Sequence, residues 1–169
     1  MSQPLHFEDL NVGDSWKSLG RTVTEADVVN FAGMTGDYDP LHMDHEYARS
    51  TPFGKPIAHG LLGLSWVAGL GSHSPTVRTI AFLRIAKWEF RRPIYVGDTV
   101  YVENEVIEKS LKGRRSGHIT WCRRLYNQCD EVLQEGHFET LVAVARVQRR
   151  SPDVATRVGA TIPAKRAAG

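Results

Sequence analysis

The run from Gly60 to Gly71, GLLGLSWVAGLG, constrains the fold more than any other part of the chain. It is apolar nearly all the way around a helical projection, and a soluble protein accommodates such a helix only by burying most of its faces. Its length and its scarcity of β-branched residues favour a helix over a buried strand. It is also shorter than the about 20 residues that a helix needs to cross a bilayer. The rest of the chain must therefore cover one buried helix.

The cover is predicted to be a β-sheet built from the second half of the chain. Four segments rich in Val, Ile, Thr, Tyr, Phe and Trp follow Pro75, at residues 79–93, 99–109, 116–128 and 132–148. In the second segment three valines and an asparagine alternate with more polar residues, as in a strand with one face on a core. We therefore predict an α+β fold, in which a meander-like antiparallel sheet wraps around one central helix.

Two short helices are predicted on either side of the segment GDYDPLHMD, residues 36–44. The first begins after the capping residue Thr24 and stops at Gly33 and Gly36. The second begins after Asp44, which caps it, and ends before Pro52. The segment between them is predicted to be irregular.

Residues 36–44 crowd three carboxylates and a histidine around Pro40. A turn accounts for the glycine, the aspartates and the proline, but not for the histidine. If the chain turns at Pro40, Asp37 and His42 come together, and a carboxylate and an imidazole so placed can share one water molecule and move its proton near neutral pH. Asp39, which precedes the proline, is interpreted as a structural residue that caps the turn.

His59 and Gly60 form a second candidate feature, at the start of the apolar run. A glycine at a helix start leaves backbone N–H groups free and lets a ligand approach closely, as the binding of a carbonyl that develops negative charge requires. Taken alone, the pair is better explained as a tight entry turn followed by a helix, with His59 as a core histidine whose hydrogen bonds are satisfied.

Other chemistries fit the sequence less well. Ser65 has neither a GxSxG elbow nor a neighbouring base, and the two cysteines fall in or near strands, where buried thiols are ordinary. No metal site is predicted, because no further ligand at zinc spacing accompanies His42, Asp44 and His45.

Charge and composition limit the expected partners and compartment. The net charge is +2 with both signs interspersed, so neither nucleic acid nor a membrane is expected as a partner. The N-terminus lacks the features of a secretory signal and the two cysteines are expected to be free thiols, which together favour the cytoplasm. Residues 1–150 are predicted to form one domain, followed by a basic, flexible tail at residues 151–169.

Three phrases in order resemble the MaoC-like dehydratases, a group that includes the (R)-specific enoyl-CoA hydratases: FAGMTGDYDPLHMDHEYA, FGKPIAHGLL and FRRPIYVGDTV. The resemblance covers residues 7–149. It implies a hotdog fold, in which a strongly curved antiparallel sheet wraps a long central helix. It also implies a homodimer whose sheets join and whose active sites form at or near the interface.

The resemblance further implies a reaction and the residues that carry it. A trans-2-enoyl thioester, of CoA or of a carrier protein, would be hydrated to a 3-hydroxyacyl thioester without a metal or a redox cofactor. Asp37 and His42 would hold and activate the water, and the backbone N–H of Gly60 would bind the thioester carbonyl. The supporting residues would be Asp39, Pro40 and His59.

The chain departs from the resemblance at Asp39, where many members carry asparagine. The added carboxylate could repel the charge of Asp37, favour a polar arm on the substrate, or only cap the turn. Two other functions remain open from the sequence. One is a hotdog thioesterase, which directs water at the thioester carbonyl, and the other is a non-catalytic module that binds acyl thioesters.

Overall fold

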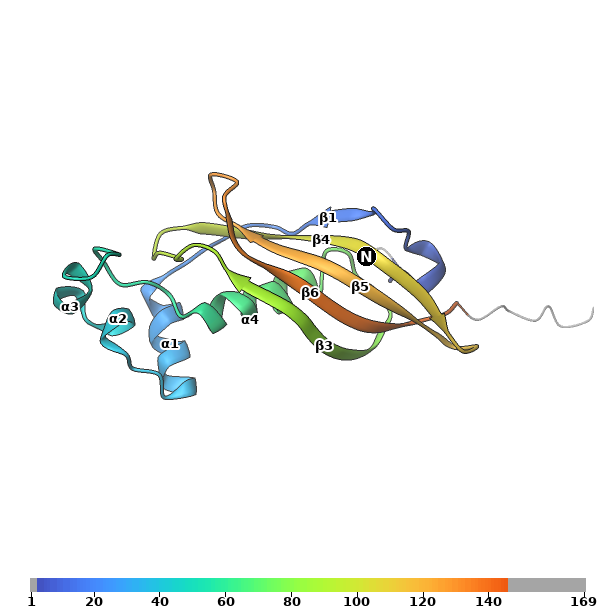
Figure 1. Cartoon of the computed structure of the whole chain (residues 1–169), viewed down its shortest axis with the longest axis horizontal. Helices are drawn as coiled ribbons and strands as arrows, with labels where there is room; N and C mark the ends of the chain where they lie inside the picture. The colour runs from blue at the N-terminus through green and yellow to red at the C-terminus, as the bar shows by residue number, and fades with distance from the viewer. Residues whose placement is uncertain (1–2, 146–169) are drawn as a thin grey trace, which may run out of the picture.

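The structure, a computed structural model, describes residues 3–145. An antiparallel sheet curves around one central helix, and three shorter helices gather at one end of it (Figure 1). The tail expected at residues 151–169, and the predicted domain boundary at residue 150, lie outside the described residues.

The helices and strands of the described residues follow a simple order along the chain. They are the 3-10 helix η1 (Phe7–Asp9), β1 (Ser15–Lys17), β2 (Arg21–Thr22), α1 (Glu25–Thr35), α2 (Pro40–Met43), α3 (His45–Arg49), α4 (Gly60–Gly71), β3 (Thr79–Phe90), β4 (Thr99–Lys112), β5 (Ser116–Tyr126) and β6 (Val132–Ala143). Within residues 3–145, every helix is too short or too polar to cross a membrane.

The sheet has the strand order β1-β4-β5-β6-β3, and β2 also pairs with β4. The prediction of a meander holds for β4, β5 and β6 but is wrong for β3, which pairs with β6 at the far edge. The reason lies in residues 91–98, which do not close a hairpin. They bind the segment that leads into α4, where Ala58 donates its N–H to the Ile94 carbonyl at 2.8 Å. Register shifts in the β3–β6 and β4–β5 pairs bend the sheet.

The core lies between α4 and the inner face of the sheet. The predicted alternation in β4 is confirmed, because Val100, Val102, Asn104 and Val106 are buried while the residues between them are less so. Gly63 of α4 has no room for a side chain, since a Cβ there would lie 2.4 Å from the Gln134 amide and 2.6 Å from the Ile94 side chain. The helix therefore packs closely against the sheet.

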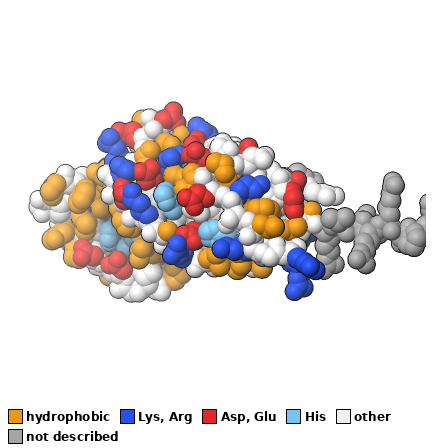
Figure 2. Space-filling model, turned by 45° about the vertical axis from the view of Figure 1, so that its right-hand side comes forward, with side chains coloured by type: hydrophobic (Ala, Val, Ile, Leu, Met, Phe, Trp, Pro, Cys, Tyr) orange, Lys and Arg blue, Asp and Glu red, His pale blue; other side chains and the backbone are white. Residues whose placement is uncertain are grey.

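The prediction that α4 is buried on most faces is only partly right. Leu62, Trp66 and Val67 are buried, but Leu61 and Ala68 are exposed, on a stripe that the described residues leave uncovered. The outer face of the sheet is different in character. Acidic and basic side chains are interspersed over it (Figure 2), and many form ion pairs across strands, for example between Arg84 and Glu139 at 2.7 Å.

Helix α1 begins and ends where the sequence predicts. The Thr24 hydroxyl accepts the N–H of Asp27 at 3.3 Å, and the Asp27 carboxylate accepts the N–H of Thr24 at 2.9 Å, which is a capping box. Gly36 ends the helix with a φ of +80°, a left-handed conformation that favours glycine. Arg21 adds an ion pair to the Asp27 carboxylate.

The Asp27→Asn variant should be less stable in a way that depends on pH. Partial burial raises the pKa of the Asp27 carboxyl, but hydrogen bonds from Thr24 and the ion pair with Arg21 outweigh it, so the pKa lies below its ordinary value of 3.8. The stabilisation is therefore present above that value and is lost as the pH falls through the lowered pKa. We expect a loss of about 1 kcal/mol in unfolding free energy at pH 7 and a smaller loss at pH 2, measured by urea denaturation.

The control is Glu25→Gln, which removes a carboxylate from the same helix turn where its side chain is 72% exposed. It should change the unfolding free energy little at either pH. An equal loss for Asp27→Asn at pH 7 and at pH 2 would contradict the assigned role of the charged carboxylate.

Candidate active site

The segment between α1 and α3 is more regular than the sequence predicts. Residues Pro40–Met43 form the short helix α2, with Pro40 as its first residue. The Asp39 carboxylate accepts the N–H of Leu41 at 2.8 Å and so caps this helix. The prediction of an irregular segment was wrong because an aspartate followed by proline is also a helix-start signal. Asp39 therefore has the structural role that the sequence favours.

Helix α2 directs His42 toward the start of α4. The Nδ1 atom of His42 lies 2.7 Å from the carbonyl oxygen of Ile57, in the strand-like segment before α4. Since a carbonyl can only accept, Nδ1 carries the hydrogen and Nε2 of the neutral ring has a free lone pair. His42 is thereby held as a base that can accept a proton at Nε2.

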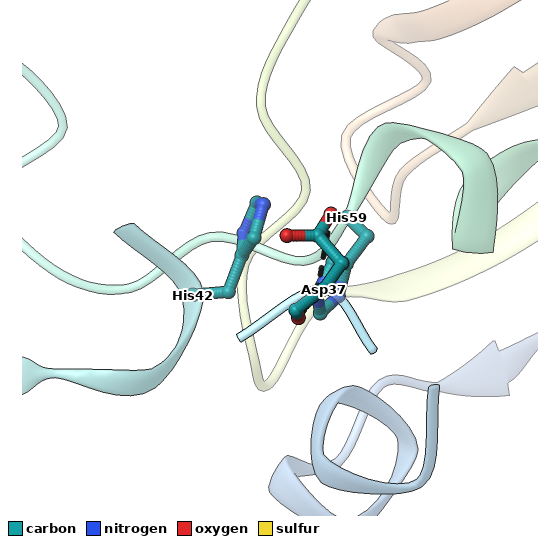
Figure 3. A group of neighbouring side chains, drawn as sticks. All are labelled: Asp37, His42 and His59. Carbon is teal, nitrogen blue, oxygen red and sulfur yellow. Dashed lines mark hydrogen bonds and ion pairs between the residues drawn. The ribbon is translucent and has the colours of Figure 1, made fainter. Parts of the chain in front are cut away.

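Asp37 lies beside His42, as the sequence predicts. Its carboxylate is about half exposed, and one of its oxygens points toward the His42 ring (Figure 3). Ligand atoms of Asp37, His42 and His59 all lie within 4.8 Å of one another. Two groups at such a separation can both hydrogen-bond one water molecule, since each bond takes about 2.8 Å.

His59, the residue that precedes α4, lies beside this pair. Its side chain is 2% exposed, its ring centroid lies 3.9 Å from that of His42, and its Nε2 donates to the Asp37 carbonyl oxygen at 2.9 Å. The Nδ1 atom is buried with no hydrogen-bond partner among residues 3–145. His59 is therefore a core histidine, as expected, but not a fully satisfied one, and it holds the backbone of Asp37 in place.

Gly60 begins α4, and its backbone N–H meets no acceptor within the described residues. A Cβ at this position would lie 2.9 Å from the ring of Phe90. Because glycine has no Cβ, no side chain shields the backbone at the start of the helix. The amide of Gln134 donates to the Gly60 carbonyl oxygen at 3.0 Å from the facing strand β6. This contact fixes the direction of the first turn of α4, and with it the direction of the free N–H.

His42 lines two cavities. One, of about 290 Å³, is lined by His42, Gly60, Phe90 and Gln134, with Arg91 and Arg92 at its rim. The other, of about 310 Å³, lies against α1 and contains the Lys55 side chain. The first cavity holds both the candidate base and the free N–H, so a carbonyl compound bound there can meet both.

Sequence reasoning missed two of the groups that shape the site. The Ile57 carbonyl is a backbone group and carries no signal in the sequence. Gln134 lies in a strand without a motif, about 70 residues from Gly60, and only the strand order brings it to the helix start. The burial pattern of β6 does not alternate cleanly there, since Leu133 and Gln134 are adjacent and both buried, so no sequence signal pointed to Gln134.

The residue types of the site also allow a divalent metal ion to be considered. Asp37, His42 and His59 offer one carboxylate and two imidazoles, which is a ligand set that zinc accepts. His42, Asp44 and His45, which the sequence analysis considered as metal ligands, have separate contacts in the structure. Asp44 caps α3 by accepting two backbone N–H groups, and His45 faces Glu25 at 3.8 Å. The expectation of a metal-free site remains a prediction.

The chain is similar in sequence to proteins of a known family. Residues 10–121 match the family described as MaoC like domain. The 3-hydroxybutyryl-CoA dehydratase of Methylorubrum extorquens is 36% identical over 156 residues, which are 92% of this chain and 93% of that protein. The (R)-specific enoyl-CoA hydratase of Rhodospirillum rubrum is 38% identical over 96 residues, which are 56% and 65% of the two chains.

A solved structure identifies the fold. A conserved hypothetical protein of Mycobacterium tuberculosis with a double hotdog fold superposes with a TM-score of 0.73 at 23% identity. The alignment covers 98% of this chain and 53% of that one. The sheet wrapped around α4 is thus one hotdog, and the chain belongs to the MaoC-like domain family.

Proposed function

We propose that the protein catalyses the reversible hydration of a trans-2-enoyl thioester to a 3-hydroxyacyl thioester. One observation carries the proposal. Ligand atoms of the Asp37 carboxylate and the His42 imidazole lie within 4.8 Å of each other, and His42 lines the same cavity as Gly60, whose N–H has no acceptor in the described residues. A water molecule and a thioester carbonyl bound at these groups would be held next to each other, which is what the reaction requires.

The chemistry follows from the hydrogen bonds of the site. Nε2 of His42 accepts a proton from the water while the Asp37 carboxylate accepts its other hydrogen in a hydrogen bond, and the water oxygen bonds to the β carbon of the substrate. The electron pair of the double bond then moves toward the thioester, and negative charge gathers on its oxygen. The Gly60 N–H, at the positive end of α4, stabilises that charge. Asp37 and His42 then return a proton to the α carbon of the substrate.

The substrate in this proposal is a thioester of CoA or of a carrier protein, and the site acts without a metal or a redox cofactor. The names of two relatives support the reaction class. One relative is a 3-hydroxybutyryl-CoA dehydratase, whose name describes the reverse direction, and the other is an enoyl-CoA hydratase. In this proposal, hydration and the reverse dehydration use the same three groups, namely a carboxylate, an imidazole and a backbone N–H.

Two competing functions use the same geometry. A thioesterase would direct the shared water at the carbonyl carbon, and an acyl-thioester-binding module would hold the ligand without reaction. The free lone pair on His42 and its position beside Asp37 favour a water-activating enzyme over a binding module. Release of free thiol from an acyl-CoA would separate the thioesterase from the hydratase.

Replacing either member of the pair should abolish most of the activity. Because each group moves or orients a proton in the reacting water, Asp37→Asn and His42→Ala should each lower kcat/KM by about 100-fold or more. The assay follows the loss of absorbance of the conjugated double bond of crotonyl-CoA and of longer trans-2-enoyl-CoAs.

The matched control is Asp44→Asn, which exchanges the same groups in the same segment and keeps a good helix cap. Its rate should stay within a few-fold of the wild type. Treatment with EDTA should also leave the rate unchanged, and a loss that zinc restores would contradict the metal-free mechanism. Hydration that survives both Asp37→Asn and His42→Ala would remove the proposed pair.

A homodimer is the second part of the proposal. Strand β3 lies at an edge of the sheet and, in the described chain, pairs with β6 alone. Its apolar side chains are open to solvent, with Ile80 55% and Phe82 54% exposed, and Leu61 on the uncovered stripe of α4 is 60% exposed. An apolar edge strand of this kind is a template for pairing with a second strand. A second copy of the chain that adds its own β3 would cover the β3 edge and the uncovered stripe of α4.

The mass in solution tests the dimer. Light scattering should give about twice the chain mass of 18.9 kDa. Ile80→Lys should shift the mass toward one chain, because a charge would be buried at the interface. The control is Leu19→Lys, at an apolar side chain that is 87% exposed far from β3 in the sheet. A wild type that has the mass of one chain would contradict this part of the proposal.

A further inference from the structure

A third cavity lies at the opposite end of α4 from Gly60, and we name it the Arg123 cavity. It has a volume of about 390 Å³ and lies between the last turns of α4 and the inner face of the sheet. The residues around Arg123 are mostly apolar: Ala68, Phe82, Trp121, Phe138 and Thr140. The function proposed above makes no use of it.

Arg123 is partly buried in this cavity, and no counter-ion accompanies it among the described residues. Its side chain forms no ion pair within residues 3–145, and the N–H of its Nε is buried without an acceptor. Burial lowers the pKa of the guanidinium to about 10, which still leaves it charged at neutral pH. A buried charge is costly unless an opposite charge or several hydrogen bonds accompany it.

The other arginines that are not fully exposed do have such partners. Arg21 forms an ion pair with Asp27, and Arg124 forms ion pairs with three glutamates on the outer face of the sheet. Arg123 and Arg124 are adjacent in β5 and so point to opposite faces. Among residues 3–145, carboxylates therefore surround one arginine of the pair and none pairs with the other.

Further polar groups accompany Arg123. Trp121 donates its indole N–H to the Thr140 hydroxyl oxygen at 2.9 Å, which leaves the hydroxyl hydrogen free to donate. Asn104 is the cross-strand neighbour of Arg123, and its amide nitrogen donates to the Gly71 carbonyl at 2.9 Å and to the Ser74 carbonyl. Its amide oxygen is buried without a partner and can accept a guanidinium hydrogen or a ligand hydroxyl.

Gly71 keeps the space around these groups open. A Cβ at Gly71 would lie 3.0 Å from the Asn104 amide oxygen and 3.1 Å from a terminal nitrogen of Arg123. The guanidinium also lies 4.6 Å from the ring centroid of Phe138, and this cation–π contact offsets part of the cost of its burial. Stacking on a ring does not satisfy the Nε hydrogen, which lies in the plane of the guanidinium. The two terminal nitrogens are not in this buried, unpartnered set, and they are the donors that a carboxylate in the cavity can reach.

We propose that the Arg123 cavity binds a carboxylate at the far end of the acyl chain. The substrates would then be enoyl thioesters of dicarboxylic acids. Arg123 would donate two hydrogen bonds to the carboxylate, and Thr140 would donate a third. The apolar walls of Phe82, Trp121 and Phe138 suit the methylene groups that precede it. This inference rests on the proposed function, which places the thioester at Gly60.

The separation of the two sites gives the length of the chain. Arg123 lies beside Gly71, which follows Gly60 by eleven residues, so the guanidinium lies about 16 Å along α4 from the thioester site. Carbon–carbon bonds of about 1.5 Å at tetrahedral angles advance an extended chain by about 1.3 Å each, so the chain has about thirteen carbons. Short acids such as crotonate would leave the Arg123 cavity unused.

Matched pairs of substrates test the inference. Trans-2-enoyl-CoAs of about six to sixteen carbons would be compared, with the last carbon either a methyl or a carboxylate. Wild-type kcat/KM should favour the carboxylate, most strongly near about thirteen carbons. Arg123→Met should lower kcat/KM about 10- to 100-fold for the preferred carboxylate, while crotonyl-CoA and the methyl series change little. Arg123→Lys should retain part of the preference.

The charge control is Arg114→Met, which removes one positive charge from the exposed turn between β4 and β5. It should keep the wild-type preference, and denaturation curves should show that the Arg123 variants are folded. A wild type with no preference for the carboxylate at any chain length would overturn the inference. Solvent and the contact with Phe138 would then be enough to stabilise the charge of Arg123. A preference that Arg123→Met leaves intact would overturn it too.

Binding separates this inference from the proposed reaction. Calorimetry with saturated acyl-CoAs, which cannot react, should show tighter binding for the chain that ends in a carboxylate, and Arg123→Met should remove the difference. If no enoyl-CoA is hydrated but this difference is found, the reaction is wrong and the Arg123 site stands. If hydration is found without the difference, the reaction stands and the Arg123 site is wrong.

Discussion

The packing of α4 against the inner face of the sheet determines where every candidate functional group lies. Gly63 brings the helix so close to β6 that Gln134 reaches the Gly60 carbonyl at 3.0 Å. Burial of Leu62, Trp66 and Val67 stabilises this contact, with about 1.5–3 kcal/mol for each large side chain. One end of the helix is thereby directed at Asp37 and His42, and the other end at Arg123.

Backbone carbonyls hold the two histidines of the site. His42 donates to the Ile57 carbonyl at 2.7 Å, and His59 donates to the Asp37 carbonyl at 2.9 Å. Both carbonyls belong to chain segments next to α4 or α1, so the acid–base pair depends on those helices being in place. The side chains that act on water need no partner other than the backbone, which leaves the Asp37 carboxylate and the His42 Nε2 free for the substrate water.

The parts of the fold that could be predicted from the sequence are those with local causes. The caps of α1 and α3 rest on Thr24 and Asp44, whose partners are within three residues. The alternation in β4 reflects two faces of one strand. The approach of Asp37 to His42 was also predictable, because only Pro40 and its neighbours separate them.

The rest depends on contacts between distant segments. The place of β3 beside β6 depends on how residues 91–98 cross the start of α4. The role of Gln134 and the isolation of Arg123 from carboxylates both follow from strand order, since neither residue has a motif. A basic residue in a strand is most often a solvated one, and only the inner face of β5 distinguishes Arg123 from Arg124.

The central claim is that water on Asp37 and His42 meets a thioester held at Gly60. A crystal structure of the Asp37→Asn variant with a bound trans-2-enoyl-CoA tests it most directly. The account predicts the thioester oxygen within hydrogen-bond distance of the Gly60 nitrogen, and the β carbon facing a water molecule on the His42 Nε2 atom. A thioester oxygen directed away from Gly60, or a β carbon out of reach of that water, would contradict it.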